Sequence, residues 1–340
     1  MASRIMRVFT FLRFMRQILK SSPADLDWIQ SQGLLAVKLA QIFALRSDLI
    51  SVEKCRQLQQ LYQHASSIPS EDVFRNIEQR APEGFIDAFE HIDDVPLAAA
   101  SVGQVHRARL KDGQEVVIKV IKAQNEKTFR RDVNRMRRWL RVFLIFMPKL
   151  RKVGNPVALL NHVADYTTRE LDLRNEIKGA EELLRIKEEV SGNFQMDLLR
   201  FPKYYRELSN KDILVSEFVR GDSLEDGIEA GSLTWSTLLA LFRIHGAYLF
   251  GIGTFHGDLH PGNCIIDEDG KVEFIDKGAI CHAPDHVNKT LVTFFKHLSD
   301  HEFEQAFTSL LGLSEKELHQ EDTTAYMSQM ATIYHDFEMK

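Results

Sequence analysis

The stretch that decides the fold class is His256-Gly-Asp-Leu-His-Pro-Gly-Asn263, followed after a short interval by Asp276-Lys-Gly278. Asn263 lies five residues after Asp258, and the interval before Asp276 reads as a β-hairpin around an Asp-Gly turn. Amide and carboxylate oxygens are the ligands that magnesium prefers. The stretch therefore predicts a magnesium site made by Asn263 and Asp276, with Asp258 placed to orient an attacking hydroxyl or water.

This spacing is typical of the catalytic and metal-binding loops of kinases. Phosphoryl transfer from ATP depends mainly on positioning and on neutralising charge, which such residues supply. Asp258 alone would fit a polar turn equally well, and the combination with the two metal ligands favours catalysis. His256 and His260 are expected to be structural. The same string also occurs in small-molecule kinases that resemble aminoglycoside phosphotransferases, so the loop leaves the substrate open.

The first half supplies a candidate phosphate site. Strands are predicted over 102–110 and 115–121, joined by the turn residues Asp112-Gly113. Lys119 lies on the second strand in Val116-Val-Ile-Lys119, similar to the kinase lysine that contacts the α- and β-phosphates. The segment before it is rich in alanine where kinases carry a glycine-rich loop. The predicted nucleotide-binding residues here are Ala98, Ala99, Ala100, Ser101, Val102 and Lys119.

A lysine of this kind needs a helix glutamate to orient it. Helices are predicted over about 126–147 and 156–190, and the second contains Glu170, Asp172 and Glu176. On one continuous helix Asp172 and Glu176 share a face, and Glu170 lies about 120° away. One face would serve Lys119 and Glu170 would address another partner. An ordinary charged helix surface is the alternative.

Taken in order, these motifs resemble the UbiB-type, or AarF-domain-containing, atypical kinases, over roughly residues 30–300. That family carries a Lys-x-Gly-Gln motif, matched here by Lys38-Leu-Ala40-Gln41 with alanine in place of glycine. The resemblance implies an α+β, protein-kinase-like two-lobed fold with an N-terminal helical extension over the nucleotide pocket. It divides the chain into the extension (1–80), the N-lobe (81–220) and the C-lobe (221–340).

The resemblance also implies residue roles. Lys38, Gln41, Glu170 and Asp172 would be regulatory, with Lys38 meeting the two acids. Glu176 would join the nucleotide-binding residues as the partner of Lys119. The cofactors would be ATP and Mg²⁺. Lys277 stands where kinases usually have phenylalanine, which puts a phenylalanine-driven switch in doubt.

The implied activity is ATP hydrolysis or small-molecule phosphorylation, in support of ubiquinone biosynthesis or lipid homeostasis at a membrane surface. Expected partners are nucleotide, anionic lipid or a quinone precursor, and quinone-biosynthesis proteins. Two alternatives stay open. One is a small-molecule phosphotransferase resembling aminoglycoside kinases, and the other is a non-catalytic nucleotide-binding scaffold.

Composition narrows the setting. The net charge of −5 gives no case for nucleic-acid binding, and three scattered cysteines favour a reducing compartment. Residues 1–22 contain no acid and several arginines, which fits a membrane-surface helix, a targeting presequence or a solvated helix end. The basic, aromatic stretch 129–152 suits anionic lipid or a solvated helix face. The expected location is the cytoplasm, with peripheral attachment to the inner membrane, and the mitochondrion is left open.

Overall fold

The computed structural model describes residues 2–20, 22–47, 49–63, 67–122, 126–146, 155–314 and 318–338. The chain divides into two compact units. Unit 1 comprises Met1–Lys178 and Pro202–Val219, and unit 2 comprises Gly179–Phe201 and Arg220–Lys340. The division of the sequence into 1–80, 81–220 and 221–340 stays a prediction.

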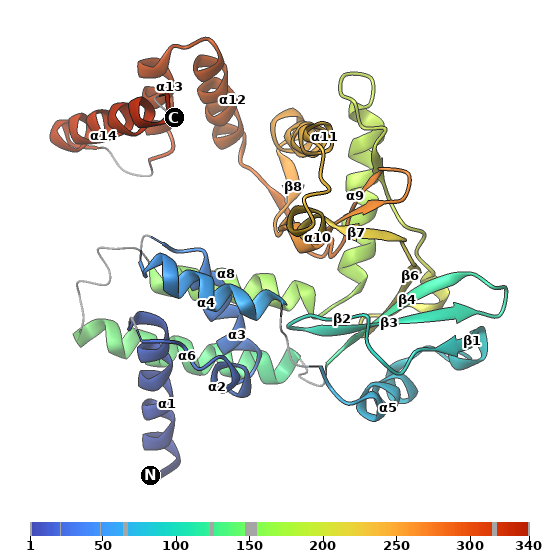
Figure 1. The fold of residues 1–340 in the computed structure, drawn as a ribbon. Helices are drawn as coiled ribbons and strands as arrows, with labels where there is room; N and C mark the ends of the chain where they lie inside the picture. The colour runs from blue at the N-terminus through green and yellow to red at the C-terminus, as the bar shows by residue number, and fades with distance from the viewer. Residues whose placement is uncertain are drawn as a thin grey trace. The chain divides into compact units, whose positions relative to one another are not determined.

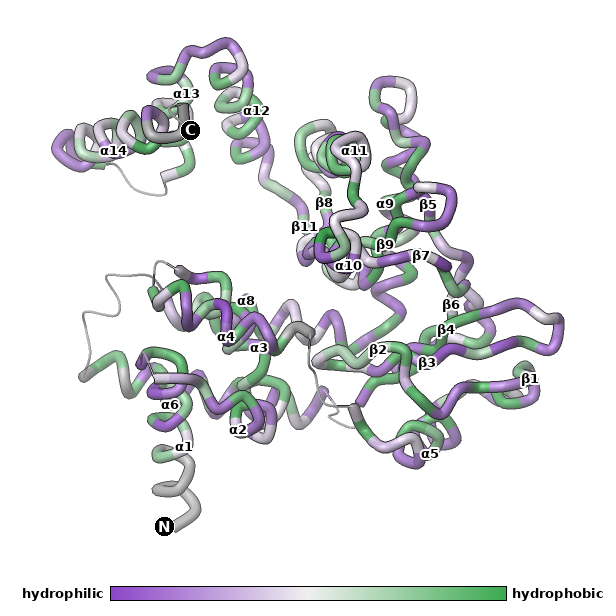
Figure 2. Tube along the Cα trace, viewed as in Figure 1, coloured by the Kyte–Doolittle hydropathy of each residue, from purple (hydrophilic) through white to green (hydrophobic). Residues whose placement is uncertain are grey.

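Unit 1 contains a helical part (Figure 1). All of its helices except α5 contribute to one apolar core. Its N-terminal helices are α1 (Ala2–Leu19), α2 (Leu26–Ser31), α3 (Leu34–Ala44), α4 (Val52–Gln63) and α5 (Ser70–Arg80). Its later helices are α6 (Glu126–Phe146) and α8 (Pro156–Glu170). Helix α3 is the most deeply placed, because apolar side chains surround almost its whole circumference. Figure 2 shows hydrophilic and hydrophobic stretches along α6, as expected for a helix with one buried side.

Unit 1 also contains an antiparallel sheet in the order β1-β3-β4-β6, with β2 paired to β3. The strands are β1 (Phe89–Ile92), β2 (Ala98–Ala99), β3 (Gly103–Leu110), β4 (Glu115–Ile121) and β6 (Ile213–Glu217). The predicted hairpin is confirmed. It turns at Gly113, whose φ of 87° suits glycine. Val116, Ile118 and Val120 are buried in a core shared with α5, which lies beside the sheet (Figure 1). Side chains alternate along a strand, so Lys119 projects from the opposite face.

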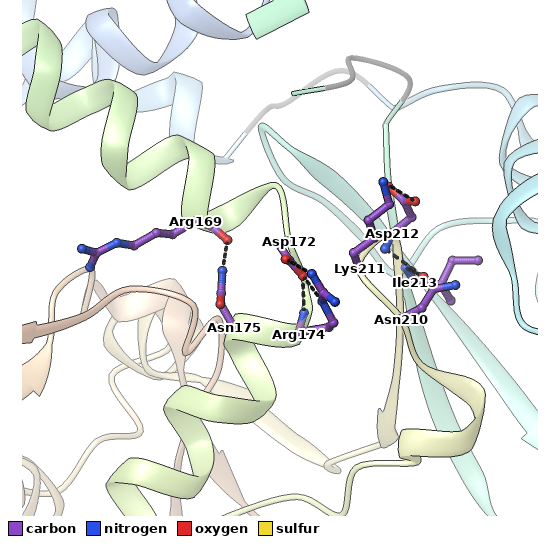
Figure 3. A network of polar contacts seen from close by, with 8 residues as sticks. All are labelled: Arg169, Asp172, Arg174, Asn175, Asn210, Lys211, Asp212 and Ile213. Carbon is purple, nitrogen blue, oxygen red and sulfur yellow. Dashed lines mark hydrogen bonds and ion pairs between the residues drawn. The ribbon is translucent and has the colours of Figure 1, made fainter. Parts of the chain in front are cut away.

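The predicted continuous helix over 156–190 is wrong. Helix α8 ends at Glu170, and α9 (Arg174–Val190) starts afresh after a three-residue break. The backbone leaves the helix because the N–H of Leu173 donates to the carbonyl of Lys211, at 2.9 Å, instead of to its own helix. Asp172 then accepts a hydrogen bond from the N–H of Arg174, at 3.2 Å, and so begins α9. Figure 3 shows this junction beside the segment 210–213.

Unit 2 contains a second sheet in the order β5-β10-β9-β7 and a separate β8–β11 pair. The sheet strands are β5 (Leu199–Arg200), β7 (Gly221–Ser223), β9 (Cys264–Asp267) and β10 (Val272–Phe274). The pair is β8 (Thr254–His256) with β11 (Ile280–His282). The predicted hairpin of 264–275 is confirmed as β9–β10.

Unit 2 contains several further helices. They are α10 (Leu224–Glu229), α11 (Trp235–Gly246), the π-helical η3 (Ala247–Ile252), the short η4 (Pro261–Asn263), α12 (Asp285–Ser299), α13 (Phe303–Leu311) and α14 (Gln320–Glu338). The main core of the unit joins α9, α11 and the sheet. Within the described residues, no helix is both long enough and apolar enough to cross a bilayer.

Candidate functional site

In unit 1 the structure brings Lys119 and Glu176 together. Lys119 projects from β4, and Glu176 lies in the first turn of α9. Their side chains form an ion pair and are 11% and 9% exposed. The contact implied by the resemblance is therefore present, and the break before α9 is what sets the position of Glu176. An ammonium held in place this far from bulk water is suited to an anionic ligand.

The alanine-rich segment lies next to this pair. Ala98 and Ala99 form β2 and pair with β3, while the N–H of Ala100 donates to the carbonyl of Gly103 at 2.9 Å. A Cβ added to Gly103 would lie 3.6 Å from Cγ of Lys119, so the turn passes directly along the lysine stem. Ser101 lies at the tip of this turn, and Val102 turns its side chain into the core. The predicted nucleotide-binding segment is therefore connected to the strand of Lys119 through β3 and Gly103, and Val102 contributes packing.

A second lysine, missed by the sequence reasoning, ties this turn down. Lys122 follows β4, and its Nζ donates to the carbonyl of Ala100 at 2.6 Å. Burial lowers the pKa of Lys122 to about 8. The residue carried no motif, so only the fold of the turn around it could have revealed this role.

The predicted regulatory residues also meet within unit 1, with one exception. Lys38 on α3 pairs with Glu170 at the end of α8, at 2.7 Å, and both side chains are buried. Gln41 donates instead to the carbonyl of Leu61 in α4, at 2.9 Å, so it holds two helices of the extension together. The expected contact between Lys38 and Asp172 is wrong. Asp172 pairs with Arg174 at 2.6 Å, because the helix break turns it toward α9, and the hydrogen bond from Arg174 lowers the pKa of Asp172 (Figure 3).

In unit 2 the predicted catalytic loop, residues 256–263, is held in shape by hydrogen bonds between its own polar groups. Asn263 donates from Nδ2 to the carbonyl of Asp258 at 3.0 Å, which leaves its amide oxygen as the atom for a cation. The N–H of Asp258 donates to Nδ1 of His256, at 3.2 Å. Nε2 of the same ring lies 3.0 Å from the carbonyl of Ile275. His256 is therefore neutral with its proton on Nε2, and burial lowers its pKa.

These bonds join the catalytic loop to Asp276. The N–H of Ile275 donates to the carbonyl of Asn263 at 2.9 Å, which sets the two predicted metal ligands on neighbouring backbone. Asp276 adopts φ 58°, a left-handed conformation that is uncommon outside glycine. No group of three or more His, Cys, Asp or Glu side chains suited to a metal lies in the described part of the chain. The amide and carboxylate oxygens fit Mg²⁺, which keeps several waters and takes its remaining ligands from substrate phosphates.

The comparisons with known proteins decide the family. The family model of the ABC1 atypical kinase-like domain matches residues 60–310. This chain belongs to that family. A Marinobacter nauticus protein named "Probable protein kinase UbiB" is 31% identical over 283 residues, which cover 79% of this chain and 50% of that protein. An uncharacterized chloroplastic aarF domain-containing protein kinase of Arabidopsis thaliana is 26% identical over 288 residues, covering 84% of this chain and 53% of that protein.

The fold agrees with the family. The structure of Mycobacterium tuberculosis Rv3197 in complex with erythromycin superposes with a TM-score of 0.54 at 20% identity, over 94% of this chain and 76% of that one. The expected α+β, kinase-like fold and the UbiB-type resemblance are confirmed. The chain spans about half the length of the curated relatives it matches.

Proposed function

We propose that this ABC1-family chain binds Mg-ATP and transfers the γ-phosphoryl group to water or to a small alcohol. The observation that carries the proposal is the buried ion pair between Lys119 and Glu176. Burying two charges costs free energy that their mutual attraction only partly offsets, so such a pair is weak evidence for stability alone. Binding of a phosphate ligand, which is anionic, accounts for a buried lysine at this position.

The residues divide the work. Lys119 would neutralise the α- and β-phosphates while Glu176 holds its ammonium in place. Asp258 would orient the attacking oxygen and accept its proton as the new P–O bond forms and the bond to ADP breaks. Asn263 and Asp276 would hold Mg²⁺, which supplies positive charge to the phosphates when bound. The turn 98–102 would line the nucleotide.

The proposal for the cellular role is supported by the resemblance to UbiB-type proteins and by the relatives named UbiB. We propose that the activity supports ubiquinone biosynthesis or lipid homeostasis, with anionic lipid, a quinone precursor or quinone-biosynthesis proteins as partners. A peripheral site on a membrane suits the basic, amphipathic α6, which carries Arg130, Arg131, Arg135, Arg137, Arg138 and Arg141. The aromatic side chains of Phe143 and Phe146 and the residues 147–152 lie outside the described residues, as do the side chains of residues 1–8.

Nucleotide binding by the purified chain tests the proposal. We expect a fluorescent ATP analogue to bind, with higher affinity in Mg²⁺ than in EDTA. Lys119→Met should weaken binding about tenfold or more, because it removes a charge-assisted contact to phosphate. Lys111→Met, in the exposed turn between β3 and β4, is the matched control and should bind like wild type. Equal binding by Lys119→Met and Lys111→Met would overturn the phosphate role of Lys119.

A further inference from the structure

The residue after the predicted metal ligand is a buried lysine. Lys277 is 1% exposed, and its Nζ lies 3.7 Å from Oε1 of Glu273, which is itself 1% exposed. The same ammonium lies 5.8 Å from the ring centroid of Phe201. Lysine is almost never buried this completely unless it is paired. The Phe that kinases usually carry at this position has been replaced by a charge with an assigned partner.

The pair belongs to a larger charged network in unit 2. Glu273 on β10 also lies 3.5 Å from Nε of Arg200, its register partner on β5. Arg200 in turn reaches Asp267, at the end of β9, at 3.2 Å. Two cations and two carboxylates therefore alternate across three neighbouring strands and the segment that follows β10. Charges that alternate in this way compensate one another away from water.

The backbone around Lys277 is equally confined. A Cβ added to Gly179 of α9 would lie 2.0 Å from the carbonyl oxygen of Lys277, so the chain presses directly against the helix there. On the preceding side Asp276 is in the left-handed region, with φ 58°. A non-glycine residue keeps such a conformation only where its surroundings hold it. The segment 276–277 is thus confined in two ways: its backbone packs against α9 at Gly179, and the side chain of Lys277 is held by its ion pair.

We propose that Lys277 is a positioning residue whose ion pair with Glu273 holds Asp276 in the conformation that binds the metal. The inference rests on the proposed function. An aromatic side chain at this position can slide in an apolar pocket. An ammonium in a low-dielectric interior is attracted to one fixed carboxylate, and leaving that carboxylate has a large cost. Lysine in place of phenylalanine therefore exchanges a side chain that can move between two states for one that an ion pair holds in place.

The test uses Lys277→Met, which keeps the length of the side chain without its charge, together with Glu273→Gln and the double variant. Lys271→Met, on the exposed turn of the β9–β10 hairpin, is the matched control. Two quantities are measured for each protein: nucleotide affinity in EDTA, and the Mg²⁺ concentration that gives half-maximal enhancement of nucleotide binding. Hydrogen exchange of the segment 272–282 in metal-free protein and the melting temperature complete the set.

We expect Lys277→Met and Glu273→Gln each to raise the half-saturating Mg²⁺ concentration about tenfold, to leave nucleotide affinity in EDTA unchanged, and to speed exchange over 272–282. The double variant should recover the melting temperature, because no uncompensated charge remains buried. The double variant should not recover the Mg²⁺ dependence, because the ion pair that positions Asp276 is still missing.

The outcomes separate the two claims. Absence of Mg²⁺-dependent nucleotide binding in wild type would overturn the proposed function and this inference with it. If wild type binds and Lys277→Met matches Lys271→Met in Mg²⁺ dependence, only the positioning role fails. Recovery of the Mg²⁺ dependence together with the melting temperature in the double variant would also overturn it, since that is the behaviour of a purely structural pair. The double variant keeps the test decisive if a single variant does not fold.

Discussion

Nζ of Lys38 lies 2.7 Å from the carboxylate of Glu170, although the two residues are 132 positions apart in the sequence. The pair joins α3, in the N-terminal extension, to the end of α8, and it is surrounded by the apolar core of unit 1. Lys38 also lies 5.3 Å from the ring centroid of Tyr166, on the preceding turn of α8. The extension is therefore tied to the helix that leads into the Lys119–Glu176 pair.

Loss of the lysine should be costly for folding. In Lys38→Met the carboxylate of Glu170 stays buried without its main counter-charge, so we expect the free energy of unfolding to fall by about 3–5 kcal/mol. Chemical denaturation measures this directly. Lys127→Met, on the exposed side of α6, is the control and should change stability by no more than about 0.5 kcal/mol. A loss below about 1 kcal/mol for Lys38→Met would contradict the prediction, because it would show that the buried carboxylate of Glu170 does not depend on the charge of Lys38.

Glu176→Gln should weaken nucleotide binding without removing any group that touches the nucleotide. The amide keeps the size of the side chain but lacks its charge, so the ammonium of Lys119 loses its fixed counter-charge. We expect a loss of affinity for the ATP analogue of about tenfold. Isothermal titration with Mg-ATP provides the measurement, and Glu182→Gln, further along α9 in the same helix, is the comparison. Unchanged affinity in Glu176→Gln would mean that the pair does not position Lys119 for phosphate.

The pKa of Lys122 gives a pH-dependent contribution of known sign. Burial lowers it to about 8 in the folded chain, against about 10.4 in an unfolded one, so the unfolded state binds more protons between these values. The contribution of Lys122 to stability should therefore rise with pH across this window. Compared with Lys122→Met, wild type should gain about 1 kcal/mol between pH 7 and pH 9.5, after allowance for solvent screening at a half-buried site. Denaturation of both proteins at the two pH values measures the free energy of unfolding of wild type minus that of Lys122→Met. A difference that stays constant or falls between pH 7 and pH 9.5 would contradict the prediction.

Gln104 links the sheet to the chain entering α5. Its side chain accepts from the N–H of Ile68 at 2.9 Å, donates to the carbonyl of the same residue at 3.3 Å, and lies 3.0 Å from Nε2 of His106. Gln104→Leu would leave these buried groups without partners, and we expect a loss of about 2–4 kcal/mol. Thermal denaturation measures it, with Gln59→Leu on the exposed side of α4 as control. Equal melting temperatures for the two variants would mean that solvent replaces the lost bonds.

The sequence predicted what depends on short-range signals. The Asp-Gly hairpins around Gly113 and Gly270 follow from local turn chemistry and are confirmed. The spacing of Asp258, Asn263 and Asp276 is likewise a short-range signal, and the phosphoryl-transfer site that it predicts stays a proposal. The break between α8 and α9 was not predictable in this way, because it depends on a hydrogen bond from Leu173 to distant Lys211. The periodic pattern runs through the break, and so the helical-face argument for Glu170 and Glu176 was wrong although Lys119 does pair with Glu176.

The contacts of Lys122 and Lys277 could be recognised only from the fold, because nothing in the local sequence marks either contact. Lys122 acts through the carbonyl of Ala100, which only the folded turn brings near. Lys277 was noticed in the sequence as a departure from phenylalanine, but its partner Glu273 reads there as an ordinary alternating residue of β10. A lysine at that position gives no sequence signal of burial, and the pairing depends on how the strand and the following loop pack together.

The most direct test of the central claim is steady-state ATP hydrolysis by the purified chain as a function of Mg²⁺ concentration, for wild type beside Asp276→Asn. The account predicts turnover that saturates with Mg²⁺ in wild type and falls at least about 100-fold in the variant, because a metal-holding carboxylate is removed from a reaction that depends on charge neutralisation. Turnover of the same magnitude in Asp276→Asn, or bound nucleotide with no turnover in wild type, would contradict it.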